Sequence, residues 1–480
     1  MKLNKIILQL TSDNYSNFSN QLKENRADKF LILLNHFRDE TSISEAELLA
    51  KLDVKQAAFY TLKSRLLDKI QEFLYKNTAD TRVELLQNVA NIEHLVYQTQ
   101  PETAISILKK LEKELIEHDM PSELIIVYKA LKKLHIHSEK YYEYLQLYNK
   151  HVAFNLAHDK AEEILSLFCR TLGEYSLNKN NDTLDLLVLY KKEMSNVCRL
   201  YQSHHLTIYK NILFTHFALF CPVESEMKDD STLEEMLKES LTIIESHPED
   251  RTYKHILNVI NFLYFEYYIH LKLYKNASKY FETISNNMES FLFLNHSCFV
   301  YRFLISKIEW FLLEKKEANL INEEEVHSFE PDVTNMNGFV YFQFYKASAE
   351  FYAKNYSAAL QTLNKLINEV SFKNISFSEM EAKSFLALVN TICGRHDQAE
   401  VNIRSVSRKI TEENEDTKYA AASLFLKIIK TSSSPKKNEK LEKMIETNHL
   451  LGLTNIGKYA FLPYIKLSEE TLKSLAKQAN

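Results

Sequence analysis

Glycine and proline are scarce in this chain, and that scarcity constrains its fold more than any motif. Its 480 residues include 5 glycines and 7 prolines, whereas average usage of the two together is roughly 12%. Glycine supplies the backbone conformations of tight turns, and proline supplies rigid corners; sheets and irregular catalytic loops need many of both. A long chain with so few of them is expected to consist of helices joined by short polar turns. We therefore predict an all-α fold.

The order of apolar and polar residues supports this prediction and suggests boundaries. Apolar residues recur with helical spacing in segments of about 12 to 20 residues, separated by polar breaks. The longest irregular stretch runs over 321–338, is acidic at first, and contains Pro331 and Gly338. The predicted parts are an N-terminal helical bundle (1–80), a first run of helical hairpins (81–320), a linker or hinge (321–338), a second run of hairpins (339–431) and a C-terminal helical cap (432–480).

Charge and cysteine content narrow the class of protein. The net charge is −5, so no global positive field would attract nucleic acid or an acidic membrane. The five cysteines are odd in number and include no C-x-x-C pair, which is typical of buried thiols in a reducing compartment. The longest apolar run, 260–271, is shorter than the ~20 residues that span a bilayer. We expect a cytoplasmic protein without membrane insertion.

Sequence motifs typical of catalytic, nucleotide-binding or metal-binding sites are incomplete in this chain. Residues Gly452 to Lys458 fit the start of a phosphate-binding loop, but the next position, which must supply a hydroxyl for Mg²⁺, is Tyr459. The closest histidine pairs, at 135 and 137 and at 204 and 205, lack the i, i+4 spacing that aims two imidazoles at one ion from a helix. No G-x-S-x-G nucleophile motif occurs. We therefore predict no enzyme activity, no cofactor and no metal.

Several segments share a helix–turn–helix pattern with small and aromatic residues at fixed places. In 347–360 a small residue, Ala347, precedes the turn, Tyr356 follows it, and Ala359 begins the packing face of the second helix, while Lys354 stands at the turn. Further copies run over 380–410, 257–285 and, more weakly, 85–118. This pattern resembles tetratricopeptide repeats. The resemblance implies a right-handed α-solenoid of helical hairpins, since one hairpin cannot bury its own apolar face and must stack on neighbours.

The same resemblance implies a function and a site. Proteins with tetratricopeptide repeats bind proteins and peptides, so the chain is predicted to be a non-enzymatic adaptor or scaffold. Its concave surface would bury the partner against aromatic side chains. The alternative is that these rings pack between stacked helices as core. The positions that this register places on the inner surface are Phe262, Glu266, His270, Tyr341, Phe344, Ser348, Phe351 and Tyr352.

Residues 44–70 offer a different function. A short helix, a break at 52–54 and a long helix from Lys55 resemble a helix-turn-helix. Five basic residues stand against two acidic ones between positions 51 and 69, and basic side chains make phosphate contacts. The resemblance to peptide-sensing bacterial regulators implies a transcription regulator that binds DNA here; a capping or docking bundle at the end of the solenoid is the other possibility. The candidate nucleic-acid contacts are Lys55, Lys63, Arg65 and Lys69.

Overall fold

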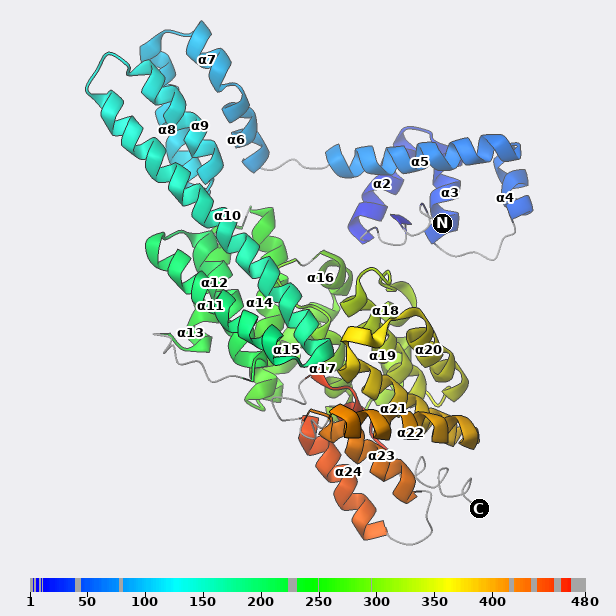
Figure 1. The fold of residues 1–480 in the computed structure, drawn as a ribbon. Coiled ribbons are helices and arrows are strands. Elements are labelled where there is room, and N and C mark those ends of the chain that lie inside the picture. The colour runs from blue at the N-terminus through cyan, green and yellow to red at the C-terminus, as the bar shows by residue number, and fades with distance from the viewer. Residues whose placement is uncertain are drawn as a thin grey trace. The chain divides into compact units, whose positions relative to one another are not determined.

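The computed structural model is all-α, as the glycine and proline content predicts (Figure 1). It describes residues 3, 6–7, 10, 12–38, 45–76, 81–222, 231–248, 250–294, 296–413, 418–432, 438–452 and 459–467. No strand occurs within these ranges. None of the helices in them is both long and apolar enough to cross a membrane. The chain divides into two compact units, one formed by residues 1–153 with 247–254 and the other by 154–246 with 255–480.

The first unit contains two separate hydrophobic cores. One core lies in the N-terminal bundle and includes Leu33, Leu34, Leu66 and Ile70, all fully buried. The other lies further along the chain and includes Leu108 and its neighbours. The bundle helices are α2 (Ser12–Glu24), α3 (Asp28–Arg38), α4 (Glu45–Leu52) and α5 (Gln56–Lys76). The following helices are α6 (Thr81–Ala90), α7 (Ile92–Gln98), α8 (Pro101–Glu117), α9 (Pro121–Leu134) and α10 (Lys140–Asn178), of which α10 continues into the second unit.

The second unit is a succession of helices and short 3₁₀ turns. In chain order they are α11 (Asn181–Leu200), α12 (His204–Phe220), α13 (Leu233–Ser246), α14 (Arg251–His270), α15 (Tyr274–Ser285), α16 (Met288–Leu294), α17 (Arg302–Leu313), η1 (Glu317–Asn322), α18 (Glu324–Ser328), α19 (Met336–Tyr352), α20 (Tyr356–Glu369), η2 (Phe372–Asn374), α21 (Ser376–Ile392), α22 (His396–Glu413), α23 (Ala420–Ser432), α24 (Asn438–Gly452) and η4 (Leu462–Tyr464).

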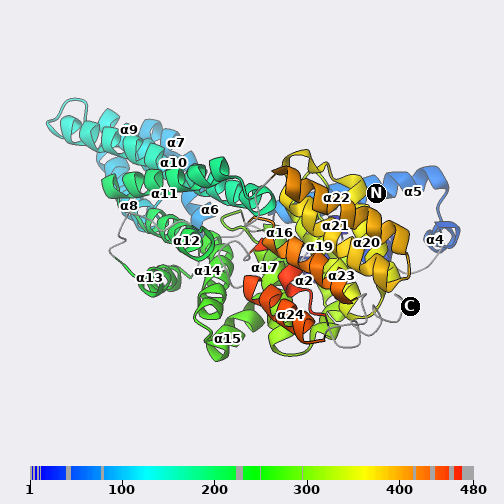
Figure 2. The same ribbon diagram turned by 60° about the horizontal axis from the view of Figure 1, so that its bottom comes forward.

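Helices α19 to α24 form consecutive hairpins that pack on one another (Figure 2). Each helix contacts the next, from α19 through α20 and α21 to α22, and α21 also contacts α19 and α23. The odd-numbered helices α17, α19, α21 and α23 therefore form one layer of the unit. The alanines at the predicted small-residue places, Ala347, Ala359 and Ala387, are fully buried, which allows the paired helices to approach closely.

Three hairpin turns share one backbone conformation. Lys272, Lys354 and Gly394 follow α14, α19 and α21, and all three have positive φ, at 59°, 61° and 74°. The amide of the next residue bonds back to the last helical turn, as in Asn355 N to Glu350 O at 2.9 Å. This is the left-handed helix ending for which glycine is the usual residue. The chain uses lysine at two of these turns, which is why it can build hairpins with so few glycines.

Segment 321–338, predicted as a linker or hinge, contains the end of η1, all of α18 and the start of α19, with residues 329–335 non-helical between them. Both η1 and α18 pack on α19. Glu325 of α18 is buried and pairs with the Lys307 ammonium of α17, itself 1% exposed. Tyr345 of α19 donates a hydrogen bond to the same carboxylate at 2.7 Å. A buried ion pair holds the segment against two helices, so it is an integral part of the second unit.

Candidate functional site

Residues 459–467 form a segment with one 3₁₀ turn and no α-helix across the layer of odd-numbered helices, drawn in red beside α17 in Figure 1. The segment contains the short turn η4, which contacts α17, α23 and α24. All of its side chains except that of Lys466 are buried. Within the predicted helical cap at 432–480, the described residues form the helix α24 and this segment with its 3₁₀ turn; residues 433–437, 453–458 and 468–480 lie outside the described part of the chain.

The aromatic side chains of the segment pack on residues of the predicted groove. The Phe461 ring stacks on the Phe344 ring of α19 at 4.6 Å between centroids and meets Tyr341 edge-on at 5.2 Å. Offset stacked and edge-to-face pairs are the favourable aromatic geometries. Phe344 and Tyr341 lie one helical turn apart on α19, so together they form the surface on which the Phe461 ring packs.

Glu381 of α21 binds the main chain of the segment. One of its carboxylate oxygens accepts hydrogen bonds from Phe461 N at 2.9 Å and from Leu462 N at 3.2 Å. Burial raises the pKa of Glu381 to about 7, while the two amides and Lys179 act in the opposite direction. Two amide donors on one buried carboxylate fix the position of the segment at this point.

Further main-chain contacts come from Tyr352 and Asn448. The Tyr352 hydroxyl of α19 donates to Tyr464 O and accepts from Lys466 N, the latter at 2.9 Å. Asn448 Nδ2 of α24 donates to Leu462 O at 3.2 Å. Side chains of three different helices therefore hydrogen-bond the backbone of the segment.

Lys179 lies at the start of the segment. Its ammonium is 3.9 Å from the centroid of the Tyr459 ring and 5.0 Å from that of Phe377. Burial lowers the pKa of Lys179 well below its usual value, and Glu381 partly counteracts this. A buried ammonium over aromatic faces gains cation–π attraction in place of lost hydration. The Tyr459 hydroxyl in turn donates to Phe220 O at 3.2 Å.

A second charged group lies beside Tyr464. The Arg302 guanidinium donates to Ser306 Oγ at 2.9 Å and lies 3.8 Å from the carboxylate of Glu266. Arg302 and Glu266 are 3% and 5% exposed. Burial raises the pKa of Glu309 to about 7, and its carboxyl is hydrogen-bonded to the Tyr464 hydroxyl.

Two cavities adjoin the segment. The larger, of about 390 Å³, is bordered by Leu312 of α17, Ile428 of α23, Ile445 of α24 and Pro463 and Ile465 of the segment. The smaller, of about 240 Å³, is bordered by the Arg302 group and by the side chains of Glu266, His270, Lys272 and Tyr274. Tyr464 and Glu309 border both cavities. The larger space is mostly apolar and the smaller one is charged.

The structure places the eight predicted groove residues in three environments. Tyr341, Phe344 and Tyr352 contact the segment, and Glu266 and His270 border the smaller cavity. The remaining three are core residues. Phe262 packs against Phe303 and other rings, Phe351 packs against Phe385 of α21, and the buried Ser348 hydroxyl donates to Phe344 O at 2.8 Å.

The N-terminal helix pair forms as the helix-turn-helix spacing predicts. Helix α4 ends at Leu52, Asp53 adopts a φ of 47°, and α5 begins at Gln56. Of the candidate nucleic-acid contacts, Lys55, Arg65 and Lys69 are exposed. Lys63 is half-buried, with its ammonium 4.5 Å from the centroid of the Phe59 ring. Three of the four basic side chains are thus available on the surface of α5 or next to it.

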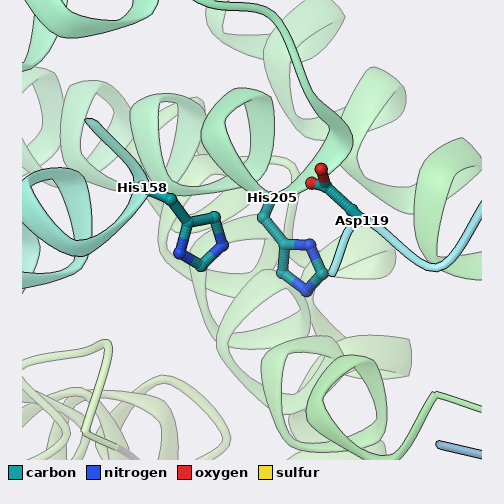
Figure 3. Close-up of side chains that lie close together, drawn as sticks. All are labelled: Asp119, His158 and His205. Carbon is teal, nitrogen blue, oxygen red and sulfur yellow. The ribbon is translucent and has the colours of Figure 1, made fainter. Parts of the chain in front are cut away.

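A histidine pair in the second unit was not anticipated. The rings of His158 on α10 and His205 on α12 are 5.4 Å apart between centroids and nearly perpendicular (Figure 3). Asp119, the third side chain in Figure 3, belongs to the first unit, where it follows α8 with a φ of 49°. Two imidazoles supply fewer than the three or four ligands that zinc sites take from protein, so the pair does not by itself constitute a metal site.

Comparison of the chain with protein-family models, with curated proteins and with solved structures gives no match. Sequence reasoning missed Glu381, Lys179 and Arg302, because nothing in their local pattern distinguishes them from solvated charges. The one available signal was the aromatic and proline-containing run from Tyr459 to Tyr464. Of the phosphate-loop-like stretch at 452–459, residues 453–458 lie outside the described part.

Proposed function

We propose that the second unit is a non-enzymatic adaptor that binds a peptide segment of another protein. The surface in question is the layer of odd-numbered helices, and the fold would be a right-handed α-solenoid of the tetratricopeptide kind. One observation carries the proposal: side chains of α19 and α21 hold a stretch of polypeptide outside the α-helices by its backbone, through Glu381 and Tyr352. Main-chain hydrogen bonds together with side-chain pockets are a recurring means of recognising peptides.

Site-specific photocrosslinking in the native cells tests this proposal. A photoreactive phenylalanine analogue is placed at Tyr274, which is 41% exposed and borders both cavities. The matched control carries the same analogue at Gln361, which is exposed on α20. We expect a protein adduct that forms from position 274, survives nuclease treatment and is absent from position 361. Equal adducts from the two positions, or none from either, would contradict the adaptor function.

The N-terminal bundle supports a second candidate, a ligand-responsive transcription regulator. The observation in its favour is the α4–turn–α5 arrangement with Lys55, Arg65 and Lys69 exposed. Duplex binding by such a surface weakens as salt rises, because phosphate contacts release counterions.

Exchanging Lys55 and Arg65 for Glu should therefore reduce duplex binding measured by fluorescence anisotropy and flatten its salt dependence. Exchanging the exposed Lys109 and Lys110 of α8 for Glu is the control. Equal losses of duplex binding in both variants, or no duplex binding by the unaltered protein, would contradict the transcription-regulator function.

A further inference from the structure

The surface beneath segment 459–467 is unusually rich in ionisable groups for a permanent core. Glu381, Lys179 and Arg302 are each less than 10% exposed, and all three lie under or beside the segment. Ionisable side chains are almost never fully buried unless they are paired. The Lys179 ammonium makes no hydrogen bond within the described part of the chain. Covering an ammonium that has no hydrogen-bond partner costs free energy, so Lys179 weakens the closure of the segment over this surface.

The bonds that hold the segment are of a kind that another polypeptide could make. Glu381 and Tyr352 bond to backbone amides and to a backbone carbonyl, which every peptide possesses. The aromatic contacts are those of Tyr459 beneath Lys179, of Phe461 on Phe344 and Tyr341, and of Tyr464 beside Arg302 and Glu309. Phe461 and Tyr464 stand at the two ends of the 3₁₀ turn η4, so the surface selects for a short turn with aromatic side chains three positions apart.

We infer that segment 459–467 is a resident ligand, which occupies in cis the site that the partner occupies in trans. The inference rests on the proposed adaptor function. It identifies the partner as a peptide segment that forms one short turn and carries two aromatic side chains separated by two residues, similar to Phe461-Leu462-Pro463-Tyr464. A tethered ligand has an effective concentration in the millimolar range, so the segment suppresses weak partners. The apolar cavity of about 390 Å³ beside Ile465 gives a partner with a larger side chain contacts that the segment does not use.

The test measures binding of a fluorescein-labelled peptide of residues 459–467 to the full chain by fluorescence anisotropy. Phe461→Ala removes the ring that stacks on Phe344 and weakens the resident segment. We expect this variant to bind the peptide at least tenfold more tightly than the unaltered protein. The matched control is Leu450→Ala, at a position 55% exposed on the neighbouring α24; its binding should equal that of the unaltered protein.

A second variant keeps the shape of the segment. Tyr464→Phe removes only the hydroxyl that bonds to Glu309, and we expect a severalfold gain in peptide affinity. The specificity of the site is checked by adding Glu381→Ala to Phe461→Ala, which removes the oxygen that accepts from the two backbone amides and should reverse most of the gain. If Phe461→Ala loses its helical circular dichroism and Tyr464→Phe, still folded, binds no more peptide than the unaltered protein, the segment is core and the inference is wrong.

Two other results separate this inference from the function on which it rests. A protein adduct from position 274, with no peptide binding by either segment variant, would leave the adaptor function standing and overturn the resident ligand. A concentration-dependent dimer of the unaltered protein that free peptide dissociates would show that a second copy supplies the segment. The assignment in cis would then be wrong.

Discussion

At the scale of single residues, Lys354 shows how this chain forms turns without glycine. Its φ of 61° lies in the left-handed region, which costs an ordinary L-residue roughly 1–2 kcal/mol. Gly394 occupies the corresponding place after α21 with a φ of 74°. From sequence alone Lys354 was a departure from the repeat pattern, whereas the structure shows that the turn conformation is kept and the residue is strained.

Lys354→Gly should therefore stabilise the protein. We expect the free energy of unfolding to rise by about 0.5–1 kcal/mol, because relief of the left-handed strain outweighs the extra chain entropy that glycine brings. The measurement is urea denaturation followed by circular dichroism. Gln361→Gly, on the exposed face of α20, is the control and should destabilise by about 0.5–1 kcal/mol. A loss of stability in both variants would show that the turn at Lys354 is unstrained.

Glu381 is a second residue whose role depends on its surroundings. Burial raises its pKa to about 7, so in the folded protein its carboxyl takes up a proton at a pH where the unfolded chain remains ionised. A raised carboxyl pKa contributes stability below the unfolded value, and this contribution is lost as the pH rises through about 7.

Comparison of the unaltered protein with Glu381→Gln isolates this contribution. We subtract the free energy of unfolding of the variant from that of the unaltered protein. This difference should decrease by up to about 3 kcal/mol as the pH rises from 4.5 to 8. Burial lowers the pKa of His216 to about 4, which acts in the opposite direction but is common to both proteins and cancels. Urea denaturation at a series of pH values is the measurement. A difference that stays constant with pH would contradict the raised pKa.

At the scale of elements, local patterns predicted the N-terminal helix pair. The expected long helix from Lys55 to about residue 75 is α5, Gln56–Lys76. This agreement arises because helical hydrogen bonds and apolar periodicity are set within a few residues. The burial of Glu325 in segment 321–338 could not be read from the sequence, because its partner is a lysine of α17.

The Lys307–Glu325 pair yields a test at this scale. Lys307→Met leaves the buried Glu325 carboxylate without its counter-ion and should destabilise the protein by about 3–5 kcal/mol. The control is Lys316→Met, whose partner Glu314 forms an exposed pair at 3.0 Å; its cost should be under about 1 kcal/mol. Thermal or urea unfolding measures both. Equal effects would mean that segment 321–338 is not held by this pair.

At the scale of the whole molecule, each unit holds its own buried core. The first unit contains the clusters around Leu33 and Leu108, and the second unit contains the layer of hairpins. Chains of this length with separate cores commonly depart from two-state unfolding.

Calorimetry should therefore show more than one unfolding transition. Lys307→Met should lower the midpoint of only the transition that belongs to the second unit, because both members of the ion pair lie there. A single transition that shifts as a whole in this variant would show that the units unfold together.

Sequence by itself determined the helical class, because scarce glycine and proline and helical periodicity act through neighbours in the chain. It also singled out Tyr341, Phe344 and Tyr352, but left open whether they face a partner or the core. Only the tertiary structure decided that they lie beneath residues 459–467, since the ring that covers Phe344 belongs to Phe461, far along the chain. Burial is a property of such distant pairs, and no local pattern encodes it.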